Sequence, residues 1–213
     1  MLNLRDSVSR VANPIGSWLY RRGVTADLVT VFGTTASVAA ALLLFPRGQL
    51  FWGTVVVTVF VLFDTLDGAV ARAAGGGSTV GGVLDSVCDR IADGVLFAAL
   101  VWWCFGVGAN RPLAVAALAC LVSGQVISYV KARAEAAGLT AEGGIIERPE
   151  RLIITLLGTG LHGLGVPRAL DVALWLLAVL SVITVGQRIA AVYRSARQHS
   201  HDGSEEREGE ATG

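Results

Sequence analysis

The sequence predicts an all-α fold: a polytopic membrane protein with six transmembrane helices and an N-terminal amphipathic surface helix. Of the 213 residues, 53% are hydrophobic and only 16% are charged, whereas a soluble domain carries about 25% charge. The apolar residues also occur in blocks of about 20, the length that a helix needs to cross a bilayer. This composition excludes a soluble module of any size. The net charge of zero argues neither for nor against nucleic acid. We expect membrane lipids, and no nucleic acid, as partners.

The six apolar segments follow one another closely and form one transmembrane domain over residues 23–198. Pro46, Pro112 and Pro167 lie in the short connections between segments, where a missing N–H group is tolerated. The predicted spans cover residues 26–45, 50–67, 82–107, 112–134, 145–161 and 169–193.

The two ends of the chain differ from this domain. Residues 1–22 form a juxtamembrane segment in which apolar and polar positions alternate with a helical period, and we expect a helix lying on the membrane surface. Its apolar positions are Leu2, Leu4, Val8, Val11, Ile15 and Leu19. Residues 199–213 are charged and contain glycine, which predicts a disordered tail.

Basic residues in short loops predict the orientation of the chain. If the N-terminus lies inside, all of the 17 lysines and arginines except Arg47, Arg111 and Arg168 fall on the inner side. This bias predicts a multi-pass protein of the plasma membrane with both termini in the cytoplasm. The N-terminal residues lack the apolar core of a cleavable signal peptide.

Four aspartates stand at or near the inner ends of the second and third predicted spans. Asp64 and Asp67 are three residues apart, and Asp85 and Asp89 are four apart, so each pair shares one face of a helix. The glycine-rich linker 72–82 is too short to do more than return the chain, so the pairs must face each other. Four carboxylates repel strongly where the dielectric constant is low, and an oxygen-only set suits Mg²⁺ or Mn²⁺. Two such ions would form a phosphoryl-transfer site.

Other interpretations of these aspartates are a solvated acidic loop and the pathway of a divalent-cation transporter. The helical spacing and the apolar flanks argue against the loop. A transport pathway would place carboxylates near the middle of the bilayer, whereas these lie at one rim beside a glycine-rich turn.

The stretch 64–89 resembles the signature of the CDP-alcohol phosphotransferase family, D-x2-D-G-x2-A-R-x8-G-x3-D-x3-D. Every fixed position matches, namely Asp64, Asp67, Gly68, Ala71, Arg72, Gly81, Asp85 and Asp89. The resemblance implies a six-helix transmembrane bundle, usually a homodimer, with a cavity that faces the cytoplasm. It implies that Asp64, Asp67 and Asp85 bind metal, and that Asp89 both binds metal and acts as general base. Two Mg²⁺ ions are expected, with Mn²⁺ as the alternative.

The same resemblance implies that CDP-diacylglycerol is the donor and that CMP is released. We expect Gly68 and Ala71 to leave room for the nucleotide, and Arg72 and Ser78 to contact it. In the family, the start of the first span also contacts the nucleotide with a pattern like T-P-N-x-[LV]-T. Here the corresponding residues are Thr25, Ala26, Asp27, Leu28, Val29 and Thr30, so the proline and the asparagine are replaced. Asp93 lies outside the signature and is interpreted as an acid that pairs helices or supports the site.

Basic residues on later helices predict an anionic acceptor. Lys131, Arg151 and Arg188 lie within or beside apolar helix on the aspartate side of the membrane, and converging cations of this kind suit a phosphate. The set resembles the branch of the family that transfers the phosphatidyl group to inositol 1-phosphate. Glycerol 3-phosphate is the alternative acceptor. The remaining inner arginines are interpreted as lipid-headgroup anchors or orientation charges, namely Arg133, Arg148, Arg194 and Arg197.

Overall fold

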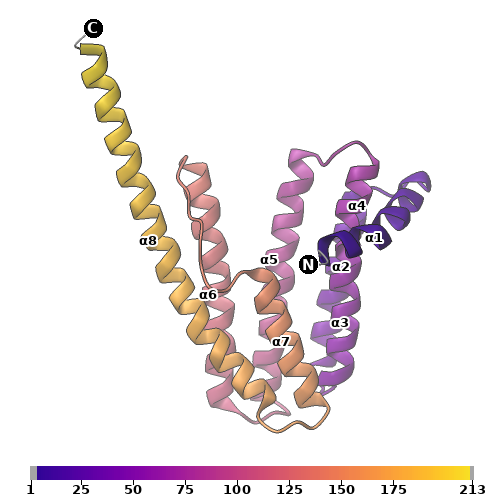
Figure 1. The fold of residues 1–213 in the computed structure, drawn as a ribbon. Coiled ribbons are helices and arrows are strands. Elements are labelled where there is room, and N and C mark those ends of the chain that lie inside the picture. Colours follow the sequence, from indigo (N-terminus) through magenta and orange to yellow (C-terminus); the bar gives the residue numbers. More distant parts are fainter. Residues whose placement is uncertain (1–3, 212–213) are drawn as a thin grey trace.

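The computed structural model describes the backbone of residues 4–211 and the side chains of residues 12–198, and within that range it contains helices and no strands (Figure 1). The predicted all-α fold is therefore confirmed. The helices are α1 (Leu4–Arg21), α2 (Ala26–Leu44), α3 (Leu50–Asp64), α4 (Leu66–Ala73), α5 (Thr79–Phe105), α6 (Arg111–Ala136), α7 (Arg148–Gly163) and α8 (Ala169–Ala211).

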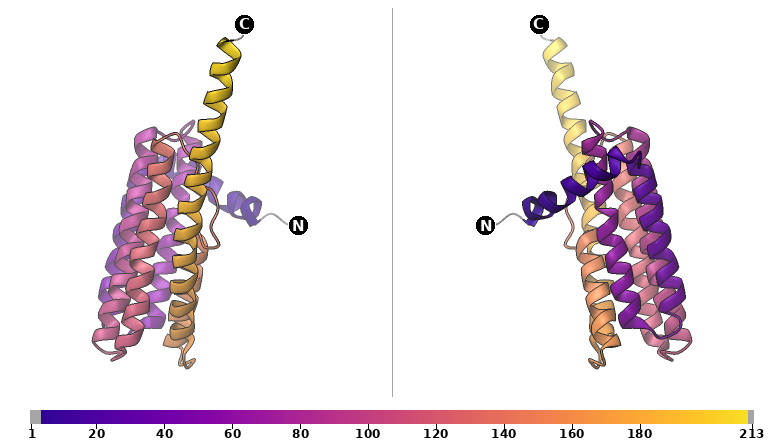
Figure 2. Two further views of the ribbon diagram at one scale, coloured as in Figure 1. Left: turned by 90° about the vertical axis from the view of Figure 1, so that its left-hand side faces the viewer. Right: turned by 90° about the vertical axis from the view of Figure 1, so that its right-hand side faces the viewer.

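The long helices run side by side and close into a ring. Along this ring, α2 contacts α3, α3 contacts α7, α7 contacts α8, α8 contacts α6, α6 contacts α5, and α5 returns to α2. Buried apolar side chains such as Phe45, Leu100, Leu113 and Leu174 fill the interior. The helix α1 lies across the bundle and packs on α4, as both side views show (Figure 2). There, a Cβ atom added to Gly16 would come within 2.7 Å of Ala69, so glycine permits the close approach.

Helix caps fix where the helices of the site begin. The hydroxyl of Thr25 accepts a hydrogen bond from the backbone N–H of Leu28 at 3.3 Å and starts α2. The hydroxyl of Ser78 does the same for Gly81 at 2.8 Å and starts α5. At α7, Glu147 begins a capping box with Pro149 in the first turn. Such caps satisfy N–H groups that the helix itself leaves without partners.

The second predicted span is interrupted just where two of the aspartates lie. The prediction runs it unbroken to residue 67, but α3 ends at Asp64 and α4 begins at Leu66. Between them, the hydroxyl of Thr65 donates to the carbonyl of Leu62 at 2.6 Å, a side-chain bond that competes with the helical ladder. The break places Asp67 in the first turn of α4, where a helix N-terminus favours negative charge.

Four segments are long and apolar enough to cross a membrane within the described residues: 26–44, 50–73, 111–136 and 169–198. The sequence predicts six such segments. The fifth predicted span corresponds to α7, which has only 16 residues, and the third corresponds to α5, whose first half carries Asp85, Asp89, Arg90 and Asp93. The four apolar segments support the polytopic character.

The last helix extends much further than the sequence predicts. The sixth span was expected to end near residue 193 and the tail 199–213 to be disordered, but α8 continues as a helix to Ala211 and projects beyond the bundle (Figure 1). The segment 204–208 contains three glutamates and an arginine and no proline, and both residue types favour helices. Several positions of the predicted surface helix, namely Leu2, Leu4, Val8 and Val11, lie outside the described side chains.

Candidate active site

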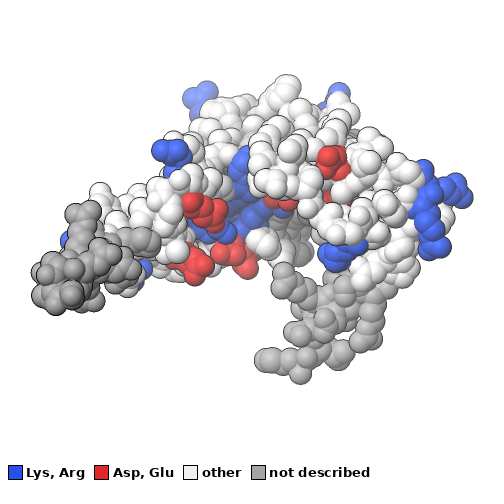
Figure 3. Space-filling view, turned by 90° about the horizontal axis from the view of Figure 1, so that it is seen from above, with Lys and Arg blue, Asp and Glu red and all other residues white. Residues whose placement is uncertain are grey.

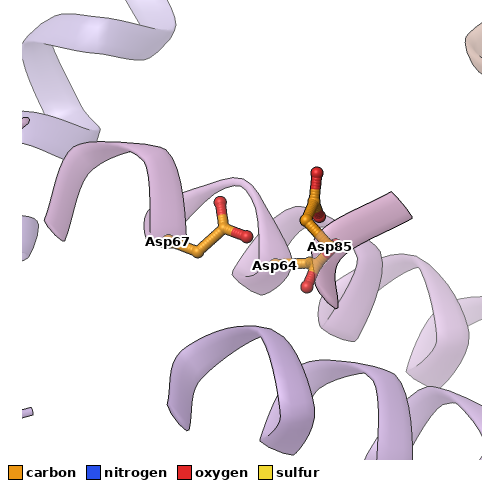
Figure 4. A group of neighbouring side chains, drawn as sticks. All are labelled: Asp64, Asp67 and Asp85. Carbon is orange, nitrogen blue, oxygen red and sulfur yellow. The ribbon is translucent and has the colours of Figure 1, made fainter. Parts of the chain in front are cut away.

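Three of the four aspartates lie together at the end of the bundle that carries the connection between α4 and α5. Asp64 comes from the end of α3, Asp67 from α4 and Asp85 from α5 (Figure 4). One carboxylate oxygen from each lies within 4.8 Å of the others, and all three side chains are half-buried. We call these residues the aspartate cluster. The predicted meeting of the two carboxylate pairs across a helix pair is thus observed for three of the four members.

The helix α2 forms the wall behind this cluster. The hydroxyl of Thr30 donates a hydrogen bond of 2.7 Å to Asp67 Oδ2, which orients that carboxylate. A Cβ atom at Gly33 would lie only 3.3 Å from Asp64 Oδ1, so the glycine leaves room for the acid. That same Oδ1 is buried and has no hydrogen-bond partner among the described residues. A buried oxygen without a partner, within an all-carboxylate set, fits a divalent cation that prefers oxygen ligands.

Asp89 lies one turn further along α5, outside the group of three. Its Oδ1 is 2.7 Å from Nη2 of Arg148, the first residue of α7. The sequence interpretation of Arg148 as a headgroup anchor or orientation charge did not anticipate this contact. The sequence nevertheless contains a signal for this contact. Arg148 directly follows Glu147, the residue that caps α7, so its backbone is held at the start of a helix on the same side as the aspartates.

The predicted nucleotide contacts gather beside the aspartate cluster. A Cβ atom at Gly81 would come within 3.0 Å of both Asp27 Oδ1 and Ser78 Oγ, so the first turns of α2 and α5 adjoin. Leu28 is 58% exposed, whereas Val29 is only 2% exposed. Val29 therefore packs into the bundle, and its side chain does not belong to an open surface.

The glycine and arginine of the signature lie on α4, next to α1. Gly68 and Ala71 are both half-buried, and a Cβ atom at Gly68 would lie 3.4 Å from Arg72 Nη1. Another nitrogen of Arg72, Nη2, donates to Asn13 Oδ1 on α1 at 3.1 Å. The transverse helix α1 thus helps to hold the arginine that the sequence assigns to the nucleotide.

A cavity of about 860 Å³ opens on the other side of Asp89, between α5, α6, α7 and α8. We call it the cationic cavity. It brings together all three residues predicted to bind the acceptor, and Figure 3, which views this end of the bundle, shows blue and red side chains around a hollow. Its polar and charged lining residues are Ser86, Asp89, Arg90, Gln125, Ser128, Tyr129, Lys131, Glu135, Glu147, Arg148, Arg151 and Arg188.

The three predicted acceptor residues differ in how firmly the structure holds them. Arg151 is 1% exposed and Arg188 is 5% exposed, whereas the side chain of Lys131 is 53% exposed and lies 3.9 Å from Glu135. Arg188 donates to the carbonyl oxygens of Ile127 and Gly143 at 3.1 and 3.2 Å. The arginines are therefore fixed parts of the wall, and the lysine lies exposed at its rim.

Comparison with known proteins shows extensive similarity. The profile of the family described as CDP-alcohol phosphatidyltransferase matches residues 23–186. A phosphatidylinositol phosphate synthase of Mycobacteroides abscessus is 58% identical over 193 residues, which cover 90% of this chain and 87% of that protein.

Two solved structures of the phosphatidylinositol phosphate synthase of Mycobacterium tuberculosis also resemble this one. The crystal structure with CDP-DAG bound has a TM-score of 0.85 and 57% identity, and it covers 87% of this chain and 95% of that chain. The complex with manganese and citrate has a TM-score of 0.84 and 57% identity. The match covers 86% of this chain and 90% of that chain.

Proposed function

Because the chain belongs to the CDP-alcohol phosphatidyltransferase family, we propose that it transfers the phosphatidyl group of CDP-diacylglycerol to inositol 1-phosphate and releases CMP. The observation that carries this proposal is the position of Asp89, which lines the cationic cavity and lies one turn from Asp85 of the aspartate cluster. A base between a metal site and a cation-lined pocket suits transfer to a phosphorylated alcohol. Family membership also argues against the divalent-cation transporter.

The aspartate cluster is proposed to hold the divalent cation. Asp64, Asp67 and Asp85 supply only oxygen atoms, and Asp89 would complete the set once its carboxylate turns from Arg148. We propose two Mg²⁺ ions, with Mn²⁺ able to replace them, as the M. tuberculosis structure in complex with manganese supports. The bound metal would neutralise the pyrophosphate of the donor.

The chemical step needs one proton acceptor and one leaving group. Asp89 takes the proton from the acceptor hydroxyl as that oxygen attacks the β-phosphorus of the donor. The bond from this phosphorus to the CMP oxygen breaks, and CMP departs with the bonding electron pair. Arg72, beside Gly68 on α4, is placed to stabilise the charge that develops on the leaving group.

The nucleotide is proposed to lie over α4, between the first turns of α2 and α5. The small residues Gly68 and Ala71 give it access to the backbone, and Asp27 and Ser78 adjoin it from either side. Leu28 is exposed and free to contact the donor. Thr30 acts less directly, because its hydroxyl is engaged with Asp67. The structure of the M. tuberculosis relative with CDP-DAG bound supports this donor.

The acceptor phosphate is proposed to bind Lys131, Arg151 and Arg188 in the cationic cavity. Charge-assisted hydrogen bonds from arginine suit phosphate oxygens. These cations would also bind glycerol 3-phosphate, so the phosphate alone does not choose between the two acceptors. The 56–59% identity to several phosphatidylinositol phosphate synthases favours the inositol compound.

In the membrane, we propose six crossings, with α5 and α7 completing the ring begun by the four most apolar segments. The site and both termini would face the cytoplasm at the plasma membrane, and α1 would lie on the surface beside α4. We further propose a homodimer. Both α1 and the end of α8 lie toward the end of the bundle that carries the aspartate cluster (Figure 1), as this topology requires.

An acceptor panel tests the proposed function. Purified protein in CDP-diacylglycerol micelles with Mg²⁺ is given inositol 1-phosphate, inositol, glycerol 3-phosphate or serine, and CMP release is measured. We expect rapid release with inositol 1-phosphate, slow release with the others, and none after chelation with EDTA until Mg²⁺ or Mn²⁺ is restored. A preference for glycerol 3-phosphate would overturn the acceptor assignment, and metal-independent release would overturn the role of the aspartate cluster.

A further inference from the structure

Asp93 lies one helical turn beyond Asp89 on α5, and its carboxylate is surrounded by three arginines. Its side chain is 4% exposed. Arg148 and Arg151 reach it from α7, and Arg90 from its own helix. Oδ1 accepts a hydrogen bond from Arg148 Nε at 3.3 Å, while Oδ2 accepts one from Arg151 Nη2 and lies 3.8 Å from Arg90 Nη2. A single buried acid therefore joins α5 to the start of α7.

The three arginines line the cationic cavity, whereas Asp93 is not among its described lining residues. Asp93 therefore makes no direct contact with a molecule in the cavity, and its hydrogen bonds act on such a molecule through the guanidinium groups. These three groups and one carboxylate leave two positive charges, part of which Asp89 balances through Arg148. Such an excess suits a phosphomonoester, which carries about −1.5 to −2 at neutral pH.

The neighbouring helix α6 leaves the guanidinium of Arg151 little freedom. A Cβ atom at Gly124 would lie 3.3 Å from both Cζ and Nε of Arg151, so the arginine rests directly against the helix backbone. Its Nε is buried without a hydrogen-bond partner among the described residues. On the same helix, Ser128 accepts a hydrogen bond from Arg90 Nη1, and Gln125 donates one to the Arg90 carbonyl.

Resting on the proposed function, we propose that Asp93 is a positioning residue that holds Arg148 and Arg151 in the wall of the cationic cavity, where they bind the acceptor phosphate. Asp93 does not touch the acceptor. It fixes the direction of the Arg148 and Arg151 side chains, which would otherwise lack a buried partner. Because Arg148 also contacts Asp89, Asp93 helps to hold the proposed base in place as well. The assignment adds Arg148 to the acceptor residues.

The variant Asp93→Asn tests this role because it keeps the shape and removes the charge. We expect the KM for inositol 1-phosphate to rise roughly ten- to hundredfold, the range for loss of charge-assisted hydrogen bonds. The KM for CDP-diacylglycerol should change by less than about twofold, and Asp93→Glu should recover part of the acceptor affinity. An unchanged acceptor KM, or an equal rise for both substrates, would overturn the proposal.

A second variant keeps the test open if Asp93→Asn does not fold. Gly124→Ala pushes on the Arg151 guanidinium without touching Asp93 and should raise the acceptor KM several-fold. Gly186→Ala on α8 is the matched control, because nothing lies within 4 Å of its added Cβ atom. A Gly124→Ala protein with the acceptor KM of the control would show that guanidinium placement does not govern acceptor binding.

The unmodified protein separates this proposal from the proposed function. If it releases CMP with glycerol 3-phosphate instead of inositol 1-phosphate, the acceptor assignment fails. The KM comparison is then made with glycerol 3-phosphate, because the role of Asp93 concerns the phosphate and not the alcohol. Variants that leave that KM unchanged would overturn the role of Asp93 under either acceptor.

Discussion

The aspartate cluster comes from one short stretch of chain, residues 64–85, whereas the cationic cavity collects side chains between residues 86 and 188 from four helices. The first depends on helical spacing and a single tight turn. The second depends on how α5, α6, α7 and α8 pack. A local motif can thus specify the chemistry of transfer, while selection of the acceptor is distributed over the tertiary structure.

Asp89 lines the cationic cavity and lies one turn from Asp85 of the aspartate cluster, so its loss should have the largest effect. Asp89→Asn removes the proposed proton acceptor, and general-base catalysis contributes about 10²- to 10⁴-fold. We expect CMP release to fall by at least about 10²-fold with every acceptor, while circular dichroism and the elution volume in detergent stay unchanged. Near-normal turnover by a folded Asp89→Asn protein would remove Asp89 from the mechanism.

The sequence predicts the local region well. Predicted and observed ends agree within about three residues for the first, third, fourth and fifth segments, and Asp64, Asp67 and Asp85 meet as expected. These successes follow from helix periodicity and span length, which are properties of neighbouring residues. The break at Thr65 is also local. It depends on the hydrogen bond from the Thr65 hydroxyl to the backbone carbonyl of Leu62. A threonine in the sequence does not by itself reveal whether its hydroxyl forms such a bond.

The distributed region is less predictable for a physical reason. Arg148 and Arg151 are three residues apart on α7 and look alike in the sequence, yet the first bridges Asp89 and Asp93 and the second is buried against Gly124. Their different surroundings come from helices far away along the chain. Val29 is likewise buried because of the way the helices pack in the ring. The spacing of residues along the sequence does not predict that burial.

Two cations that line the cationic cavity, Arg151 and Lys131, differ in burial and should therefore respond differently to removal. Arg151→Ala leaves the buried Asp93 with fewer partners, and breaking a buried ion pair costs about 3–5 kcal/mol. Lys131→Ala removes a half-exposed side chain that pairs only loosely with Glu135. We expect a clear loss of thermal stability for Arg151→Ala and almost none for Lys131→Ala.

Both variants should weaken use of the acceptor more than binding of CDP-diacylglycerol, because both side chains line the cationic cavity. Thermal unfolding in detergent gives the stability, and KM values for each substrate give the specificity. Arg151→Lys serves as a control that keeps the charge while losing the planar, forked donor set. Equal stability losses at positions 131 and 151 would remove the distinction between wall and rim.

The smallest predicted effect lies on the donor side, at Gly81. An alanine there would place its Cβ atom within 3.0 Å of Asp27 Oδ1 and Ser78 Oγ, so one of these side chains must shift. We expect the KM for CDP-diacylglycerol to rise about two- to tenfold, the equivalent of roughly 0.4–1.4 kcal/mol, with the acceptor KM unchanged. Gly77→Ala is the matched control in the same linker, since nothing lies within 4 Å of its added Cβ atom. If Gly81→Ala altered the acceptor KM instead, the separation of donor and acceptor regions on either side of Asp89 would be wrong.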